Sequence, residues 1–81
     1  MKIRIKLFAA ARELSEGGDL ELEVANGIVV RDMKIQISGN HPGLSELILR
    51  SAVSINREFA TDESVIHEND EIALIPPVSG G

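Results

Sequence analysis

The segment Lys2-Ile3-Arg4-Ile5-Lys6-Leu7-Phe8 alternates charged and aliphatic residues up to Leu7. In an extended chain, the three aliphatic residues share one face and the charged residues share the other. Such alternation predicts a half-buried strand over residues 2–8. Phe8 has the parity of the charged residues, which places it on the outer face. If the strand ends before it, Phe8 turns into the core instead, and the pattern alone favours neither outcome.

A second alternating run, at residues 19–24, has the opposite charge on its outer face. Its inward residues are leucine and valine, and its outward residues are Asp19, Glu21 and Glu23. Antiparallel pairing with residues 2–8 sets basic side chains against acidic ones, and each pair contributes roughly 0.2–1 kcal/mol. We therefore expect these two strands to be neighbours. The stretch between them, residues 9–14, predicts a short helical turn.

Residues 28–40 fit two different structures. Asn26-Gly27 is typical of a hairpin turn and predicts a strand after it. Val30, Met33 and Ile37 instead have helical spacing, and Gly39-Asn40 suits a helix end. Local signals leave both open. A small sheet with one apolar face needs a covering layer, which favours the helix, and residues 44–50 predict a second, shorter helical piece.

The remaining strand patterns are short. They lie at residues 52–56, at 59–60 and at 71–75. In the last of these, Ile72 and Leu74 point inward and Ile75 points outward. The parity of the chain thus places two large apolar side chains, Phe8 and Ile75, on the outside. An exposed apolar cluster on a small acidic protein is typical of a partner surface.

Composition excludes several functions. The 81 residues suit one domain, and eight Lys and Arg against 13 Asp and Glu give a net charge of −5, which argues against nucleic-acid binding. The sequence contains no cysteine, so thiol catalysis and cysteine zinc sites are excluded. His41 and His67 lie in predicted turns, and we expect no metal site and no bound cofactor. No apolar run is long enough for a membrane span, so we expect a cytoplasmic protein.

The last six residues are Pro76-Pro77-Val78-Ser79-Gly80-Gly81. Two prolines supply no amide donors, so a sheet cannot continue through them. We expect residues 1–75 to form the folded domain and residues 76–81 a flexible C-terminal tail. Because glycine lacks a Cβ, Gly80 and Gly81 let the backbone approach another protein's active site closely, with a terminal carboxylate as the chemical handle. The alternative is a frayed end with no role.

Three segments resemble the small, sulfur-carrier subunits of molybdopterin synthase, a ubiquitin-like family of the ThiS/MoaD type. They are the ending Glu71-Ile72-Ala73-Leu74-Ile75-Pro76-Pro77-Val78-Ser79-Gly80-Gly81, the opening Lys6-Leu7-Phe8-Ala9-Ala10-Ala11-Arg12-Glu13-Leu14, and Val53-Ser54-Ile55-Asn56-Arg57-Glu58. Length and motif order match over essentially the whole chain. The resemblance implies an α+β, β-grasp fold, in which one main helix packs on one face of a mixed sheet. It also implies that the first strand lies parallel to the last.

The resemblance implies a chemical cycle as well. An E1-like adenylyltransferase adenylates Gly81, and sulfur then converts the adenylate to a C-terminal thiocarboxylate (1-thioglycine). The tail next enters the large subunit of molybdopterin synthase and donates sulfur to cyclic pyranopterin monophosphate, in molybdenum cofactor biosynthesis. The chain itself would be non-catalytic. Partner contacts are implied at seven positions, with clearance at Gly80: Phe8, Phe59, Ile75, Pro76, Pro77, Val78 and Ser79.

Three other functions stay open at this point. A thiamine-thiazole sulfur carrier shares the same fold and tail logic. A ubiquitin-like protein modifier would use the same Gly81 to form isopeptide bonds. A plain interaction module would need no chemistry at the tail.

Overall fold

The computed structural model describes residues 1–15 and 18–77. Nine elements follow one another along this part of the chain, two of them the 3₁₀ helices η1 and η2. They are β1 (Lys2–Leu7), η1 (Ala9–Leu14), β2 (Asp19–Glu23), α1 (Val30–Asn40), η2 (Pro42–Leu44), α2 (Ser45–Arg50), β3 (Ala52–Ile55), β4 (Glu58–Phe59) and β5 (Ile72–Ile75).

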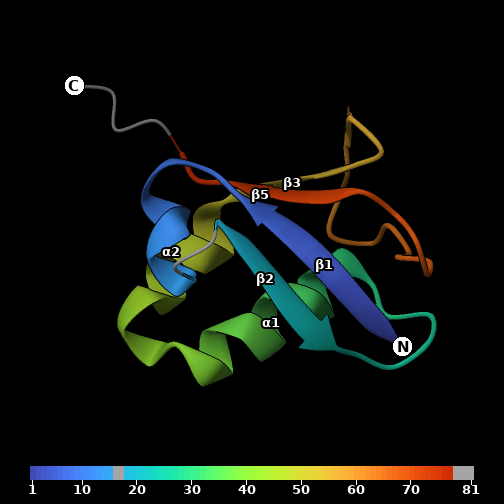
Figure 1. Cartoon of the computed structure of the whole chain (residues 1–81), viewed down its shortest axis with the longest axis horizontal. Helices are drawn as coiled ribbons and strands as arrows, with labels where there is room; N and C mark the ends of the chain where they lie inside the picture. Colours follow the sequence, from blue (N-terminus) through green and yellow to red (C-terminus); the bar gives the residue numbers. More distant parts are fainter. Residues whose placement is uncertain (16–17, 78–81) are drawn as a thin grey trace.

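The strands form one five-stranded sheet in the order β2-β1-β5-β3-β4. β1 and β5 are parallel and adjacent, and the other neighbouring strands are antiparallel. Figure 1 shows α1 and α2 together on one side of this sheet. The β-grasp fold is therefore confirmed, with the first strand parallel to the last and the main helix on one face.

The charge pattern of β1 and β2 pairs as expected. Arg4 lies opposite Glu21, Lys2 opposite Glu23 and Lys6 opposite Asp19. The Arg4 guanidinium donates a hydrogen bond to Glu21 Oε2 at 3.0 Å. This bond and the positive charge behind it lower the pKa of the Glu21 carboxyl. The prediction that these strands are neighbours is confirmed.

The open question at residues 28–40 is settled as a helix. Asn26 and Gly27 form a turn, with Gly27 at φ +82°, but the chain continues into α1 rather than into a hairpin strand. α1 begins without a side-chain cap. Its first amide groups donate instead to a distant loop, from Val30 to the carbonyl of Ser64 and from Arg31 to that of Asp62, both at 3.0 Å. No local signal could reveal these contacts, because their partners lie some thirty residues further along the chain.

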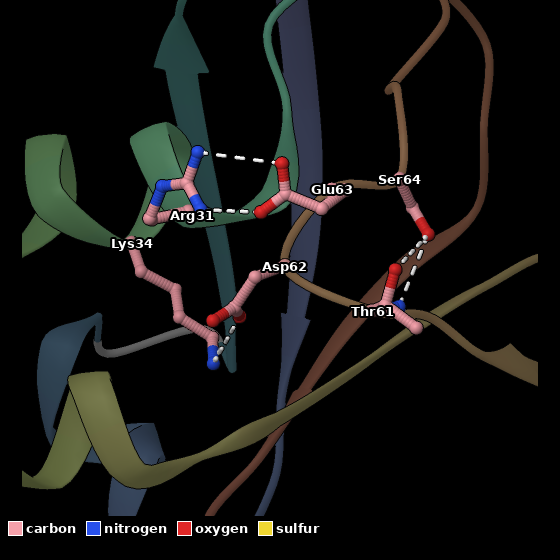
Figure 2. Close-up of polar contacts among 6 residues, drawn as sticks. All are labelled: Arg31, Lys34, Thr61, Asp62, Glu63 and Ser64. Atoms are coloured by element: carbon pink, nitrogen blue, oxygen red, sulfur yellow. Dashed lines mark hydrogen bonds and ion pairs between the residues drawn. The ribbon is translucent and has the colours of Figure 1, made fainter.

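Ion pairs fasten the same loop to α1. Figure 2 shows Arg31 against Glu63 and Lys34 against Asp62, with Lys34 Nζ 3.6 Å from Asp62 Oδ1. The Lys34 side chain is only 11% exposed, and Asp62 supplies its counter-charge. Residues 61–64 thus act as the N-terminal support of α1.

The core lies between the sheet and the helices. Ile5, Met33, Ile37, Ile48 and Leu74 are fully buried. Burying one such side chain contributes about 1.5–3 kcal/mol relative to leaving it exposed. The alternation predicted for residues 2–8 is confirmed, since the inward residues of β1 are buried and the outward ones are exposed.

The structure also differs from the expected boundaries. β1 ends at Leu7, but Phe8 keeps an extended backbone (φ −117°, ψ 153°) and its amide donates to the Leu74 carbonyl at 3.3 Å. The turn between β3 and β4 consists of Asn56 and Arg57, both with positive φ, as two-residue hairpin turns require. Pro76 is buried, whereas Pro77 is exposed, so the packed body continues one residue beyond position 75.

Within residues 1–15 and 18–77, no helix is long and apolar enough to cross a membrane.

Candidate functional site

The face of the sheet turned away from the helices changes from apolar at one end to charged at the other. Phe8, Ile75 and Ala52 form the apolar end, because Leu7 pairs with Leu74 and Ile75 with Ala52. The next row across the strands is mixed and consists of Lys6, Ala73, Ser54 and Phe59. Beyond it, β1 and β2 present the Arg4–Glu21 ion pair. We call this surface the open face.

Phe8 and Ile75 come together at the apolar end of the open face. Phe8 is 44% exposed and Ile75 is half-buried. The outward orientation that parity predicted for Phe8 is therefore correct. Both side chains line a shallow hollow of about 300 Å³, together with Lys6, Arg57, Glu71 and Ala73. An exposed aromatic beside an aliphatic side chain is the kind of surface that anchors a protein partner.

Phe59 lies on the same face but further away. It stands on the edge strand β4, paired with Ser54, so β3 and β5 separate it from Phe8. Phe59 is 78% exposed, the most exposed of the large apolar side chains in the described part of the chain. The three apolar positions expected from the sequence thus share one face without forming one continuous cluster.

The chain leaves the sheet beside the apolar end. Ile75 is the last residue of β5 and a member of the apolar row. Pro76 is buried and offers no side-chain surface to a partner in this structure, whereas Pro77 is exposed. The other expected contact and transfer positions, Val78, Ser79, Gly80 and Gly81, lie outside the described residues. A protein that covers Phe8 and Ile75 therefore also lies next to Pro77, the exposed residue that follows the packed body.

Comparison with known proteins decides the family. Residues 5–81 match the ThiS family. The chain belongs to the ThiS family. Two relatives are each named "Molybdopterin synthase sulfur carrier subunit". The relative from Arabidopsis thaliana is 35% identical over 81 residues, and the match covers all of this chain and 84% of the relative. The relative from Chlamydomonas reinhardtii is 31% identical over 83 residues, and the match covers all of both chains. The crystal structure of SAMP1 from Haloferax volcanii is 30% identical, with a TM-score of 0.79 over the full length of both chains.

In this ThiS-family chain, a hydrogen-bonded cluster fixes the border of the hollow. Asn56 donates to Asp70 Oδ1 at 3.0 Å and accepts from the Glu71 amide at 2.9 Å. The His67 amide donates to Asp70 Oδ2 at 2.7 Å. This amide bond is the main reason why the pKa of the Asp70 carboxyl is lowered, with smaller contributions from Asn56 and His67. The cluster ties the β3–β4 turn to the start of β5.

Sequence reasoning missed this cluster. The predicted turn at His67 is present and its side chain is exposed, whereas the side chain of Asp70 is only 13% exposed. The available signal was an aspartate three residues after His67, from where its carboxylate can accept from the His67 backbone amide. In the described residues, no group of three or more His, Asp or Glu lies close enough to hold a metal ion.

Proposed function

We propose that this chain is the sulfur-carrier subunit of a molybdopterin synthase. The observation that carries the proposal is the position of the apolar end of the open face, Phe8 and Ile75, where the chain leaves β5 towards its terminal glycines. The full-length similarity to relatives that bear this name supports it. A carrier must present its end to a second protein, and an apolar surface at the base of that end suits this task.

The proposed chemistry takes place at Gly81. An oxygen of its carboxylate attacks the α-phosphorus of ATP and pyrophosphate leaves, which gives an acyl adenylate. A sulfur donor then attacks the carbonyl carbon, and AMP leaves with the bonding electron pair. With hydrosulfide as donor, loss of its proton leaves the thiocarboxylate; a persulfide donor leaves an acyl disulfide, which a thiol must reduce. On delivery, the thiocarboxylate sulfur displaces an oxygen substituent from a carbon of cyclic pyranopterin monophosphate, and water hydrolyses the resulting thioester, which returns the carboxylate. Two deliveries build the dithiolene.

Two cytoplasmic partners follow from this cycle. An E1-like adenylyltransferase catalyses activation, and the large subunit of the synthase catalyses transfer. The chain itself is a carrier rather than a catalyst. Gly80 and Gly81 suit this role because, without Cβ atoms, they allow a narrow active site to close around the backbone.

The experiment is an intact-mass measurement. The full chain is incubated with the adenylyltransferase, ATP and a sulfide source, and the mass is expected to rise by the difference between one sulfur and one oxygen atom. The matched control lacks Gly80 and Gly81 and should keep its original mass. The adenylyltransferase is first shown to be active on the sulfur carrier of its own organism. If the mass of the wild-type chain then stays unchanged, the proposal is contradicted.

A second candidate function is covalent protein modification. The observation that favours it is the similarity to a protein modifier. This chain is 30% identical to SAMP1 from Haloferax volcanii and 29% identical to a second crystal structure, named small archaeal modifier protein 1 from the same organism. In this case Gly81 forms an isopeptide bond with a lysine of another protein. Because Arg57 is the last Lys or Arg of the chain, trypsin would leave residues 58–81 attached to the modified lysine. Such branched peptides, absent when residues 80–81 are deleted, would support this function.

A further inference from the structure

The hollow on the open face has a charge opposite to that of the whole chain. The sequence carries a net charge of −5, yet two of the side chains that line the hollow are cationic, Lys6 from β1 and Arg57 from the β3–β4 turn. Among the described residues, Glu71 is the one carboxylate that lines it. This local reversal calls for a physical reason, because an acidic protein gains nothing in solubility from cations placed at its apolar surface.

Lys6 is the less satisfied of the two cations. Within the described ranges, 1–15 and 18–77, no carboxylate lies within ion-pair distance of its ammonium. Asp19 is its neighbour across the β1–β2 register but makes no ion pair with it. By contrast, Arg4 on the same face is paired with Glu21 at 3.0 Å.

Arg57 is only partly used as well. Its Nε lies 3.7 Å from Glu71 Oε1, and its side chain is 87% exposed. In the described part of the chain, its guanidinium makes an ion pair with Glu71 alone and donates no side-chain hydrogen bond. The two terminal nitrogens of a guanidinium form the fork that a carboxylate accepts best.

The floor between these cations is apolar. Phe8, Ala73 and Ile75 line it, so a lone anion would leave the apolar area uncovered. A polyanion such as nucleic acid is disfavoured by the net charge. The combination suits a protein segment that carries an aliphatic or aromatic side chain next to an aspartate or glutamate.

We propose that the hollow binds an acidic side chain of the synthase large subunit, held by Lys6 and Arg57 beside an apolar side chain that covers Phe8 and Ile75. This inference rests on the proposed function, because it names what the partner presents at that surface. Exposed and half-exposed charges contribute modestly to affinity, but they discriminate strongly against the wrong partner.

The test measures the affinity of the full-length chain for the purified large subunit from the same organism. Lys6→Gln and Arg57→Gln are each expected to weaken binding about two- to fivefold, in the range of single exposed ion pairs. The double variant should lose more than either single variant does. Lys2→Gln is the matched control, since it removes the same charge from the same face of β1, outside the hollow, and it should bind as the wild type does.

The outcomes separate the inference from the proposed function. If the wild type does not bind the large subunit, the proposed function fails and the inference with it. If the wild type binds and Lys6→Gln behaves as Lys2→Gln does, or binds more tightly, only the inference is overturned. Concentration-dependent dimerisation of the chain alone that is lost in Phe8→Asp would assign the hollow to a second copy and would also overturn it. A partner Glu→Lys or Asp→Lys variant that restores binding to Lys6→Glu would confirm the pair directly.

Discussion

At the scale of single residues, Phe8 and Ile75 carry the docking hypothesis. Both lie on the open face, away from the core that Leu7 and Leu74 enter from the neighbouring positions. Period-two alternation separates these neighbours because successive side chains of a strand point to opposite faces. A polar substitution at either of these outward-facing positions therefore affects the surface without opening a cavity in the core.

We predict that Phe8→Asp or Ile75→Asp weakens binding to the large subunit by about tenfold to a hundredfold, the range of interface anchors. Calorimetric or optical binding measurements give the affinity, and thermal unfolding by circular dichroism checks the fold. Leu74→Asp is the contrasting control, because that side chain is fully buried and the variant should unfold. Unfolding of Phe8→Asp as well would show that the aromatic ring is part of the core.

At the scale of elements, α1 depends on a loop far away in the sequence. Residues 61–64 accept its first amide hydrogen bonds, and Asp62 supplies the counter-charge of Lys34 (Figure 2). Only Lys34 is nearly buried in this pair, since the Asp62 side chain is 59% exposed. Removing Asp62 leaves the Lys34 charge without its partner, whereas replacing Lys34 by an apolar group removes the need for that partner. The two sides of this contact are therefore not equivalent.

Asp62→Ala is expected to lower the free energy of unfolding by about 1–2 kcal/mol, whereas Lys34→Met should be close to neutral. Glu63→Ala provides the matched control in the same loop. Both members of the Arg31–Glu63 pair are more than half exposed, so its loss should change stability by less than about 0.5 kcal/mol. Urea unfolding of the three variants measures these differences, and equal losses for Asp62→Ala and Glu63→Ala would contradict the buried-charge explanation.

The Asp70 cluster makes the connection between the β3–β4 turn and β5 sensitive to acid. Folding lowers the pKa of this carboxyl, so its contribution to stability is present at neutral pH, above the unfolded value of about 3.9, and is lost as the pH falls through that value towards the lower folded pKa. Asp70→Asn should therefore lose stability at pH 7 but lose less on acidification than the wild type does.

Urea unfolding at pH 7 and pH 3 tests this difference. Glu68→Gln is the control, because it removes a charge from the same turn without touching the hydrogen bonds of Asp70. If wild type and Asp70→Asn lose the same stability between the two pH values, the lowered pKa of Asp70 does not contribute to the acid sensitivity of the fold.

At the scale of the whole molecule, charge is unevenly distributed along the chain. Residues 58–71 contain no lysine or arginine and one histidine, His67. The same segment contains six carboxylates: Glu58, Asp62, Glu63, Glu68, Asp70 and Glu71. A field of one sign accelerates encounter with a partner of the other sign more than it tightens the complex. The partners are therefore expected to carry basic residues around their docking surfaces.

We predict that the association rate with the large subunit falls steeply as salt rises, while the dissociation rate changes little. Stopped-flow or surface-based kinetics at low and physiological salt measure both rates. Glu58→Gln and Glu68→Gln, both exposed, should each slow association without affecting the fold. An association rate that barely responds to salt would count against electrostatic steering.

The sequence by itself determined the alternating strands and the β1–β2 pairing, because these depend on strand parity and on charges opposed across neighbouring strands. It left open whether Phe8 points outward, which the structure shows. It also carried the motifs that placed the chain in its family. It left residues 28–40 ambiguous and did not reveal that Asn56 also holds Asp70.

Tertiary structure decided those points, because their partners are distant in the sequence. The helix α1 obtains its N-terminal hydrogen bonds from residues 61–64, and Asp70 is held by Asn56 across the start of β5. The hollow likewise exists only once β1 and β5 lie parallel beside β3, which brings Lys6, Arg57 and Ile75 to one surface. Local propensity cannot encode such meetings, since each depends on which strands the whole chain brings side by side.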